Sequence, residues 1–120
     1  MRSVLNKFFF LDEHLFVIVG LKFIHGRFKP RIILSNNYES VSFSLEDFES
    51  IFVSRSQIIS DWFEGIGKCV FPINDDFLFF TMDIPKMMIF RHLSTHQCIK
   101  VNSLQFHRLL KLHPCIKNYF

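Results

Sequence analysis

The sequence predicts an α+β fold of two tandem β-β-β-β-α repeats, with antiparallel sheets packed on helices as a pseudo-symmetric pair. Three observations support this prediction. Phe occupies 17 of the 120 positions and favours strands, whereas Ala, the best helix former, is absent. Two segments 58 residues apart show the same order of apolar and polar residues. In both segments, the apolar spacing changes from that of a strand to that of a helix at a polar capping residue.

The internal similarity aligns residues 40–52 with residues 98–110. In the first segment, Val41 and Phe43 alternate with polar residues, which indicates a half-buried strand, and the apolar residues that follow have helical spacing. The aligned apolar pairs are Val41 with Ile99, Phe43 with Val101, Phe48 with Phe106, and Ile51 with Leu109. We therefore expect each segment to form a strand and then a helix that buries its first Phe.

Polar residues suited to cap a helix N-terminus stand at the change of pattern in both segments. Ser44 is followed three residues later by Asp47, and Asn102 is followed at the same spacing by Gln105. At this spacing the two side chains can each accept a hydrogen bond from the other residue's backbone N–H. The helices are therefore expected to begin near residues 45 and 103.

The similarity continues to the last residue of the sequence with a shift of one position. Residues 59–63 match residues 116–120 at a distance of 57. Pro114 lies next to the shift, and a proline inside a helix removes one hydrogen bond and clashes with the preceding turn. We expect Pro114 to break the second helix.

Further strands are expected upstream of each repeated segment. Alternating or continuous apolar runs bounded by turn residues predict strands at residues 7–11, 15–24, 31–35, 69–73, 77–82 and 87–93. The chain then divides into a first β-β-β-β-α repeat at residues 1–63, a hinge at 64–68 and a second repeat at 69–120. Each repeat alone would bury too little surface, so we expect the two to share a core. A single sandwich with accidental internal similarity is the alternative.

Charge, cysteine content and hydropathy restrict the class of protein. The first 63 residues carry seven basic and seven acidic side chains, whereas the remainder carries seven basic and four acidic ones. This surplus is compatible with an acidic partner. Three Cys residues predict free thiols in a reducing compartment. Because no apolar run approaches the ~20 residues of a membrane span, we expect an intracellular, soluble protein without a membrane partner, compatible with a nuclear location.

Basic and aromatic residues are interleaved in both halves. Single-stranded nucleic acids require cations for their phosphates and aromatic faces for their unpaired bases. The candidate nucleic-acid-binding residues are Lys22, Arg27, Phe28, Lys29, Arg31, Lys86, Arg91 and Lys100. Neighbouring residues on a strand point to opposite faces, so Lys22 and Phe23 cannot belong to one platform. Alternatively, these charges protect an exposed strand edge from aggregation.

Two stretches of the first half also resemble a known family. The first is FIHGRFK at residues 23–29, a basic hairpin, and the second is VSFSLEDF at residues 41–48, a strand running straight into a helix. Both are similar to elements of the positive-cofactor-four transcriptional coactivators, over roughly residues 15–60. The resemblance implies four strands with a C-terminal helix, binding of single-stranded DNA, and pairing of two domains through their helices. The second repeat has DIPK at residues 83–86 in place of the glycine hairpin.

Metal-binding and catalytic chemistry have weaker support. Residue types that ligate zinc cluster near the end of the sequence, at His92, His96, Cys98, His107, His113 and Cys115. However, the sequence contains no C-x-x-C pair, no phosphate-binding glycine loop and no G-x-S-x-G motif. We therefore expect no metal site, no cofactor and no enzymatic activity.

These features together predict a non-enzymatic protein that binds single-stranded nucleic acid, with DNA as the type that the resemblance implies. The alternative is a small structural or interaction protein of a virus or mobile element that assembles through a Phe-rich surface. Formation of a homo-oligomer is compatible with both functions. Salt dependence distinguishes them, because phosphate contacts weaken with added salt and apolar contacts do not.

Overall fold

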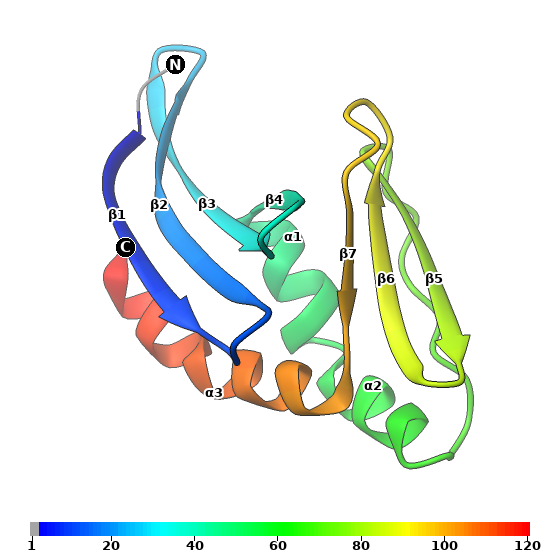
Figure 1. Cartoon of the computed structure of the whole chain (residues 1–120). Coiled ribbons are helices and arrows are strands. Elements are labelled where there is room, and N and C mark those ends of the chain that lie inside the picture. Colours follow the sequence, from blue (N-terminus) through cyan, green and yellow to red (C-terminus); the bar gives the residue numbers. More distant parts are fainter. Residues whose placement is uncertain (1–2) are drawn as a thin grey trace.

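Within residues 3–120, which the structure describes, the computed structural model contains two antiparallel sheets, three α-helices and one π-helical turn. The first sheet consists of β1 (Ser3–Phe10), β2 (Phe16–Ile24), β3 (Arg27–Ser35) and β4 (Ser40–Ser44), in that order. The second consists of β5 (Phe77–Asp83), β6 (Lys86–His92) and β7 (Cys98–Val101). The two sheets stand side by side with a helical segment between them (Figure 1), which confirms the α+β class.

The helical segment of the first half is interrupted, whereas the helix of the second half is continuous. The first comprises α1 (Leu45–Phe48), the π-helical turn η1 (Glu49–Val53) and α2 (Ser56–Phe63). The second is α3 (Ser103–Tyr119). Among the described residues, no helix combines the length and apolar character needed to cross a membrane.

The expected break at Pro114 is wrong, because α3 continues through this residue. A proline leaves one backbone carbonyl of the preceding turn without its helical partner. Pro114 itself is exposed, whereas Phe106, Leu109 and Ile116 of the same helix are buried. The remaining contacts of the helix with the core hold it in place.

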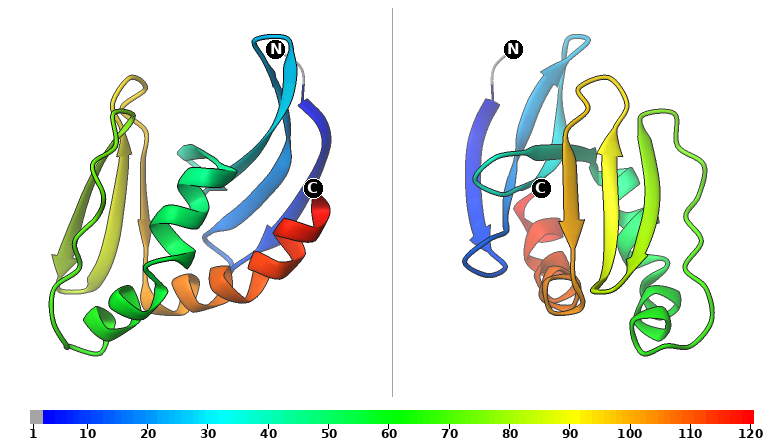
Figure 2. Two further views of the ribbon diagram at one scale, coloured as in Figure 1. Left: turned by 180° about the vertical axis from the view of Figure 1, so that it is seen from behind. Right: turned by 45° about the vertical axis from the view of Figure 1, so that its right-hand side comes forward.

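The second half has three strands rather than the expected four, so the β-β-β-β-α pattern is wrong there. Residues 69–73 form no strand and run alongside β5 (Figure 2). Phe71 instead packs its ring against Phe79 and Phe90, with centroid distances of 5.3 and 5.6 Å. Pro72 lacks the N–H group that a sheet ladder requires, which explains why an apolar run lies here without strand pairing.

Both repeated segments form a strand followed by a helix, as predicted. At the start of α1, Ser44 Oγ accepts a hydrogen bond from the Asp47 N–H at 3.1 Å. At the start of α3, Asn102 Oδ1 accepts from the Gln105 N–H at 2.8 Å, and Gln105 Oε1 accepts from the Asn102 N–H at 2.9 Å. The second helix therefore begins with a complete capping box.

Replacing Asn102 by Ala is expected to lower the free energy of unfolding by about 1 kcal/mol, because the helix loses a capping acceptor. Urea denaturation followed by circular dichroism measures the change. The control is Asn118→Ala near the other end of α3, where the side chain is exposed. An equal effect at both positions would show that the cap contributes nothing particular to stability.

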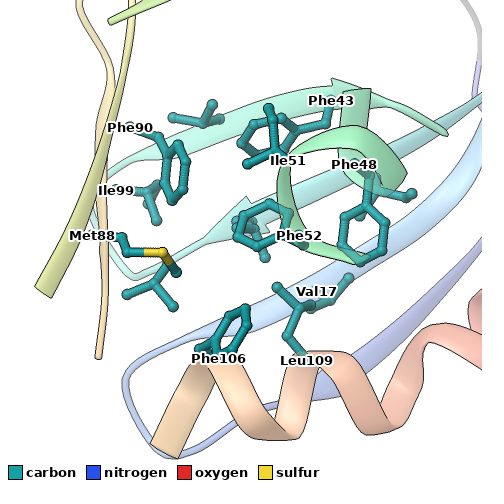
Figure 3. Packing of buried hydrophobic residues seen from close by; sticks show 14 of the residues in the cluster. Val17, Phe43, Phe48, Ile51, Phe52, Met88, Phe90, Ile99, Phe106 and Leu109 are labelled. Carbon is teal, nitrogen blue, oxygen red and sulfur yellow. The ribbon is translucent and has the colours of Figure 1, made fainter. Parts of the chain in front are cut away.

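One hydrophobic core joins both sheets and the helices, in agreement with the expectation that the halves share a core. Phe43 of β4 stacks on Phe77 of β5 with ring centroids 4.9 Å apart. Phe52 of η1 lies 5.2 Å from Phe90 of β6. Figure 3 shows Phe43, Phe52 and Phe90 in the same cluster of buried side chains as Phe106 and Leu109 of α3. The aromatic side chains of the two halves therefore interlock.

Candidate nucleic-acid interface

A long hairpin formed by β2 and β3 carries most of the candidate binding residues. Its two-residue turn consists of His25 and Gly26, which both have positive φ angles, of 51° and 77°. Two successive turn residues with positive φ give the turn a twist that matches the right-handed twist of the flanking strands. The turn sets the strand register so that Lys22 lies directly opposite Lys29 and Arg31 lies opposite Gly20.

Four cations of this hairpin lie on one face of the first sheet. Residues directly opposite each other, and residues two apart on a strand, share a face. The register therefore places Lys22, Arg27, Lys29 and Arg31 together on what we term the outer face. The alternating residues on the other face, Val17, Val19, Ile32 and Leu34, are fully buried in the core. The outer face is thus the one directed away from the core.

The cations of the outer face make few contacts with protein groups. Arg27 and Lys29 are exposed, and Lys22 and Arg31 are half-buried. Arg31 Nε donates a hydrogen bond to Ser42 Oγ at 3.1 Å, which orients the guanidinium group across the sheet. Among the described residues, the ion pairs are those of His14 and His113 with glutamates, and none involves these four cations.

Two large hollows border Arg31 on this part of the molecule, besides a much smaller space of about 20 Å³ that Lys22 also lines. One has a volume of about 550 Å³, and its lining includes Arg27, Phe28, Lys29, Ser44 and Glu46 besides Arg31. The other has a volume of about 450 Å³ and extends from Arg31 towards the turn between β6 and β7. Since Glu46 places a carboxylate in the first hollow, the two differ in their electrostatic character.

Aromatic rings that sequence reasoning did not single out also lie on the outer face. Phe8 and Phe10 of β1 are 55% and 76% exposed. Both approach Phe16 of β2, with ring centroids 6.3 and 5.7 Å away. The register pairs Phe8 with Ile18 and Phe10 with Phe16, on the face of Lys22. The period-two spacing of Phe8 and Phe10 was the available signal, but it does not reveal which face is outer.

Phe28 does not share the outer face with the four cations. It lies opposite Phe23 in the hairpin, and the two rings contact each other edge to face with centroids 5.0 Å apart. Both rings are partly exposed, at 49% and 42%. Strand parity therefore places the cations on one face and the aromatic pair on the other, although Phe28 also lines the larger hollow together with Arg27 and Lys29.

The second sheet brings together two of its three candidate residues. Arg91 and Lys100 are exposed, and the register places them on one face, with Arg91 opposite Leu78 and Lys100 opposite Ile89. Phe80, which is 45% exposed, lies on the same face. Like the outer face of the first sheet, this face combines cations with an aromatic ring, but it carries fewer of each.

Lys86, the third candidate of the second sheet, is half-buried and its ammonium group contacts α2. Its Nζ donates a hydrogen bond to the Trp62 carbonyl oxygen at 2.6 Å. The same ammonium group lies 5.1 Å from the centroid of the Trp62 ring. A cation near the last turn of a helix interacts favourably with the helix dipole and its unpaired carbonyls. The contacts of Lys86 therefore stabilise the end of α2.

The His and Cys residues near the end of the chain are dispersed in the fold. His107 Nδ1 lies 2.7 Å from the Ser103 carbonyl oxygen, and His113 Nε2 lies 3.0 Å from Glu49 Oε2. Within the part of the chain that the structure describes, no group of three His, Cys, Asp or Glu side chains is arranged to hold a metal ion.

The electrostatic environment of the partly buried cysteines keeps them as thiols. Burial raises the pKa of Cys69, although the nearby Arg55 opposes this effect. Burial also raises the pKa of Cys98, and the carboxylate of Glu39 adds to the shift. Both side chains are therefore protonated at neutral pH.

The outer face combines cations, the groups that phosphates require, with exposed aromatic rings, the groups on which unpaired bases stack. No family model, no curated protein and no solved structure matches this chain.

Proposed function

We propose that the protein binds single-stranded nucleic acid on the outer face of its first sheet and catalyses no reaction. The observation that carries the proposal is the presence of four cations and three aromatic rings on one sheet face directed away from the core. Phosphates and unpaired bases are the ligand groups that this combination suits. A duplex fits less well, because its bases are stacked inside and cannot reach the rings.

The spacing of the cations suits an extended strand. Arg27, Lys29 and Arg31 alternate along β3, so their Cα atoms are separated by about 7 Å, twice the rise of a β-strand. Lys22 lies beside this row on β2. The rings of Phe8, Phe10 and Phe16 lie farther across the same face. The phosphates of the strand would follow the basic row while its bases turn towards the rings.

The order of the elements supports an internal duplication as part of this proposal. The meander of β2, β3 and β4 leads into a capped helix, and so does the meander of β5, β6 and β7. Two such units packed through their helices would match the pairing of domains in the positive-cofactor-four family. In this interpretation, Arg91, Lys100 and Phe80 extend the binding surface onto the second sheet, and DNA is the preferred nucleic acid.

The salt dependence of binding tests the proposed function directly. Neutralising four phosphates of a single strand is expected to give a slope of about −3 for log K against log salt concentration, since each contact contributes about −0.7. Fluorescence anisotropy with a labelled oligothymidylate at several salt concentrations measures the slope. A duplex of equal length is the control and is expected to bind more weakly. A flat salt dependence would contradict the proposal.

Assembly through a Phe-rich surface is the second candidate function. The observation that favours it is the exposure of Phe8 and Phe10 on β1, a strand at the edge of the first sheet. Exposed apolar side chains on an edge strand favour association between chains. Under this alternative, Phe10→Ser is expected to abolish concentration-dependent association in analytical ultracentrifugation. If the unaltered chain binds no single strand at low salt but self-associates, assembly is the better assignment.

A further inference from the structure

The groove between Arg31 and the turn after β6 joins the two halves of the protein. Lys22 and Arg31 of the first sheet line one side, together with Ser42. His92, Thr95 and Gln97, from the end of β6 and the turn that follows, line the other side. The hairpin tip of the first sheet and the β6–β7 turn lie at the same end of the molecule (Figures 1 and 2). A ligand in this groove would therefore contact both halves at once.

The groove carries positive charge without a carboxylate. Among the described residues, its lining includes two cations and no Asp or Glu. This distinguishes it from the neighbouring hollow, which contains Glu46, and from a third hollow beside Lys100, which contains Asp12 and Glu39. An anion in the groove would meet attraction from Lys22 and Arg31 and no opposing charge in the lining.

Hydrogen bonds within the lining leave donors available to a ligand. The bond from Arg31 Nε to Ser42 Oγ leaves the terminal N–H groups of the guanidinium available. Gln97 Oε1 accepts from the Ser40 N–H at 3.1 Å, which assigns the amide orientation and leaves the Gln97 NH₂ group as a donor. His92 Nδ1 accepts from the Thr95 N–H at 3.3 Å, so a neutral His92 carries its proton on Nε2.

We propose that this groove binds a phosphate group, through Lys22 and Arg31 on one side and Gln97 and His92 on the other. The proposal rests on the proposed function and extends it, because the phosphate is assigned to the backbone of the bound single strand. Charge-assisted hydrogen bonds to two cations, supplemented by further side-chain donors, are the pattern that recognises phosphate oxygens. The groove then guides the strand from the first sheet to the second.

Gln97→Glu tests this assignment with minimal change in shape. The carboxylate can still accept the Ser40 N–H bond, but it replaces a donor with a negative charge in the groove. We expect about tenfold weaker binding of a labelled oligothymidylate at low salt, since repulsion replaces one hydrogen bond. Asn118→Asp is the matched control, because it adds the same charge on the exposed side of α3. It is expected to change affinity less than twofold.

A second variant and a second probe keep the test decisive. Thr95→Asp adds a charge from the exposed turn and is expected to weaken binding in the same way, should Gln97→Glu fail to fold. Inorganic phosphate alone, titrated into the unaltered protein, is expected to shift the NMR signals of the Gln97 side-chain amide more than those of the Asn118 amide. Equal shifts, or none, would overturn the phosphate site.

The outcomes separate this inference from the proposed function. If Gln97→Glu and Asn118→Asp bind the oligonucleotide equally, the inferred path through the groove is wrong, although binding to the outer face stands. If inorganic phosphate shifts the NMR signals of the Gln97 amide but Gln97→Glu leaves the affinity for the oligonucleotide unchanged, the groove binds free phosphate. The assignment to the backbone of the nucleic acid is then overturned. If no strand binds the unaltered protein, the proposed function fails and the assignment to the strand fails with it.

Discussion

Reversing Arg27 and Lys29 to Glu is expected to weaken single-strand binding about a hundredfold at low salt, since two phosphate contacts become repulsive. Both side chains are exposed near the tip of the β2–β3 hairpin. Because surface substitutions usually alter stability by under about 0.5 kcal/mol, the variant should fold normally. Anisotropy titrations measure the affinity, and thermal unfolding measures the stability.

The control for this variant reverses Lys111 and Lys117, which are exposed on α3. It changes the net charge by the same amount but leaves the outer face intact. We expect the affinity of this control to fall by less than fivefold, through the long-range field alone. Equal losses in the two double variants would mean that binding follows net charge, and the outer face would then not be the site.

Phe106→Ala is expected to lower the free energy of unfolding by about 3–5 kcal/mol, because the truncation leaves a cavity in a fully packed core. Phe106 is completely buried on α3, and its ring lies 5.9 Å from that of Phe63 on α2. Urea denaturation measures the change. Leu104→Ala, on the same helix but 55% exposed, is the control and is expected to have a small effect.

The shared core also predicts how Phe106→Ala unfolds. Since rings from both sheets interlock, the loss of packing at α3 is expected to destabilise the whole chain in one transition. Fluorescence of Trp62 and far-UV circular dichroism should therefore give the same urea midpoint. Two separate midpoints would contradict the single core and would favour halves that unfold independently.

Local patterns in the sequence were sufficient to locate most of the elements. Alternation of apolar residues identified β4 and β7, and the polar residues Ser44 and Asn102 identified the starts of the helices that follow. These signals depend on neighbouring residues along the chain, namely strand parity, helix periodicity and the unpaired N–H groups of a first helical turn. These signals can therefore be recognised before any tertiary contact is known.

The two local errors both involve a proline and the packing of its neighbours. Residues 69–73 have the apolar composition of a strand, but Pro72 lacks the N–H of a ladder donor, and Phe71 packs on Phe79 and Phe90 beside β5 instead of extending the sheet. Pro114 was expected to end α3, but the buried contacts of the helix on both sides of it outweigh one missing hydrogen bond. Both outcomes also depend on contacts with other elements of the fold, which the spacing of residues within one segment does not reveal.

By itself, the sequence determined the α+β class, the capped strand-to-helix junctions and the shared parity of Arg27, Lys29 and Arg31, because each depends on spacing along the chain. Tertiary structure decided which of these groups lie together. The two-residue turn set the register that adds Lys22 to the row, and the pairing of β1 with β2 added Phe8 and Phe10. The contact between Lys86 and Trp62 of α2 removes this candidate cation from the exposed faces of the sheets. Strand register and helix packing are relations between distant segments, so spacing within one segment cannot specify them.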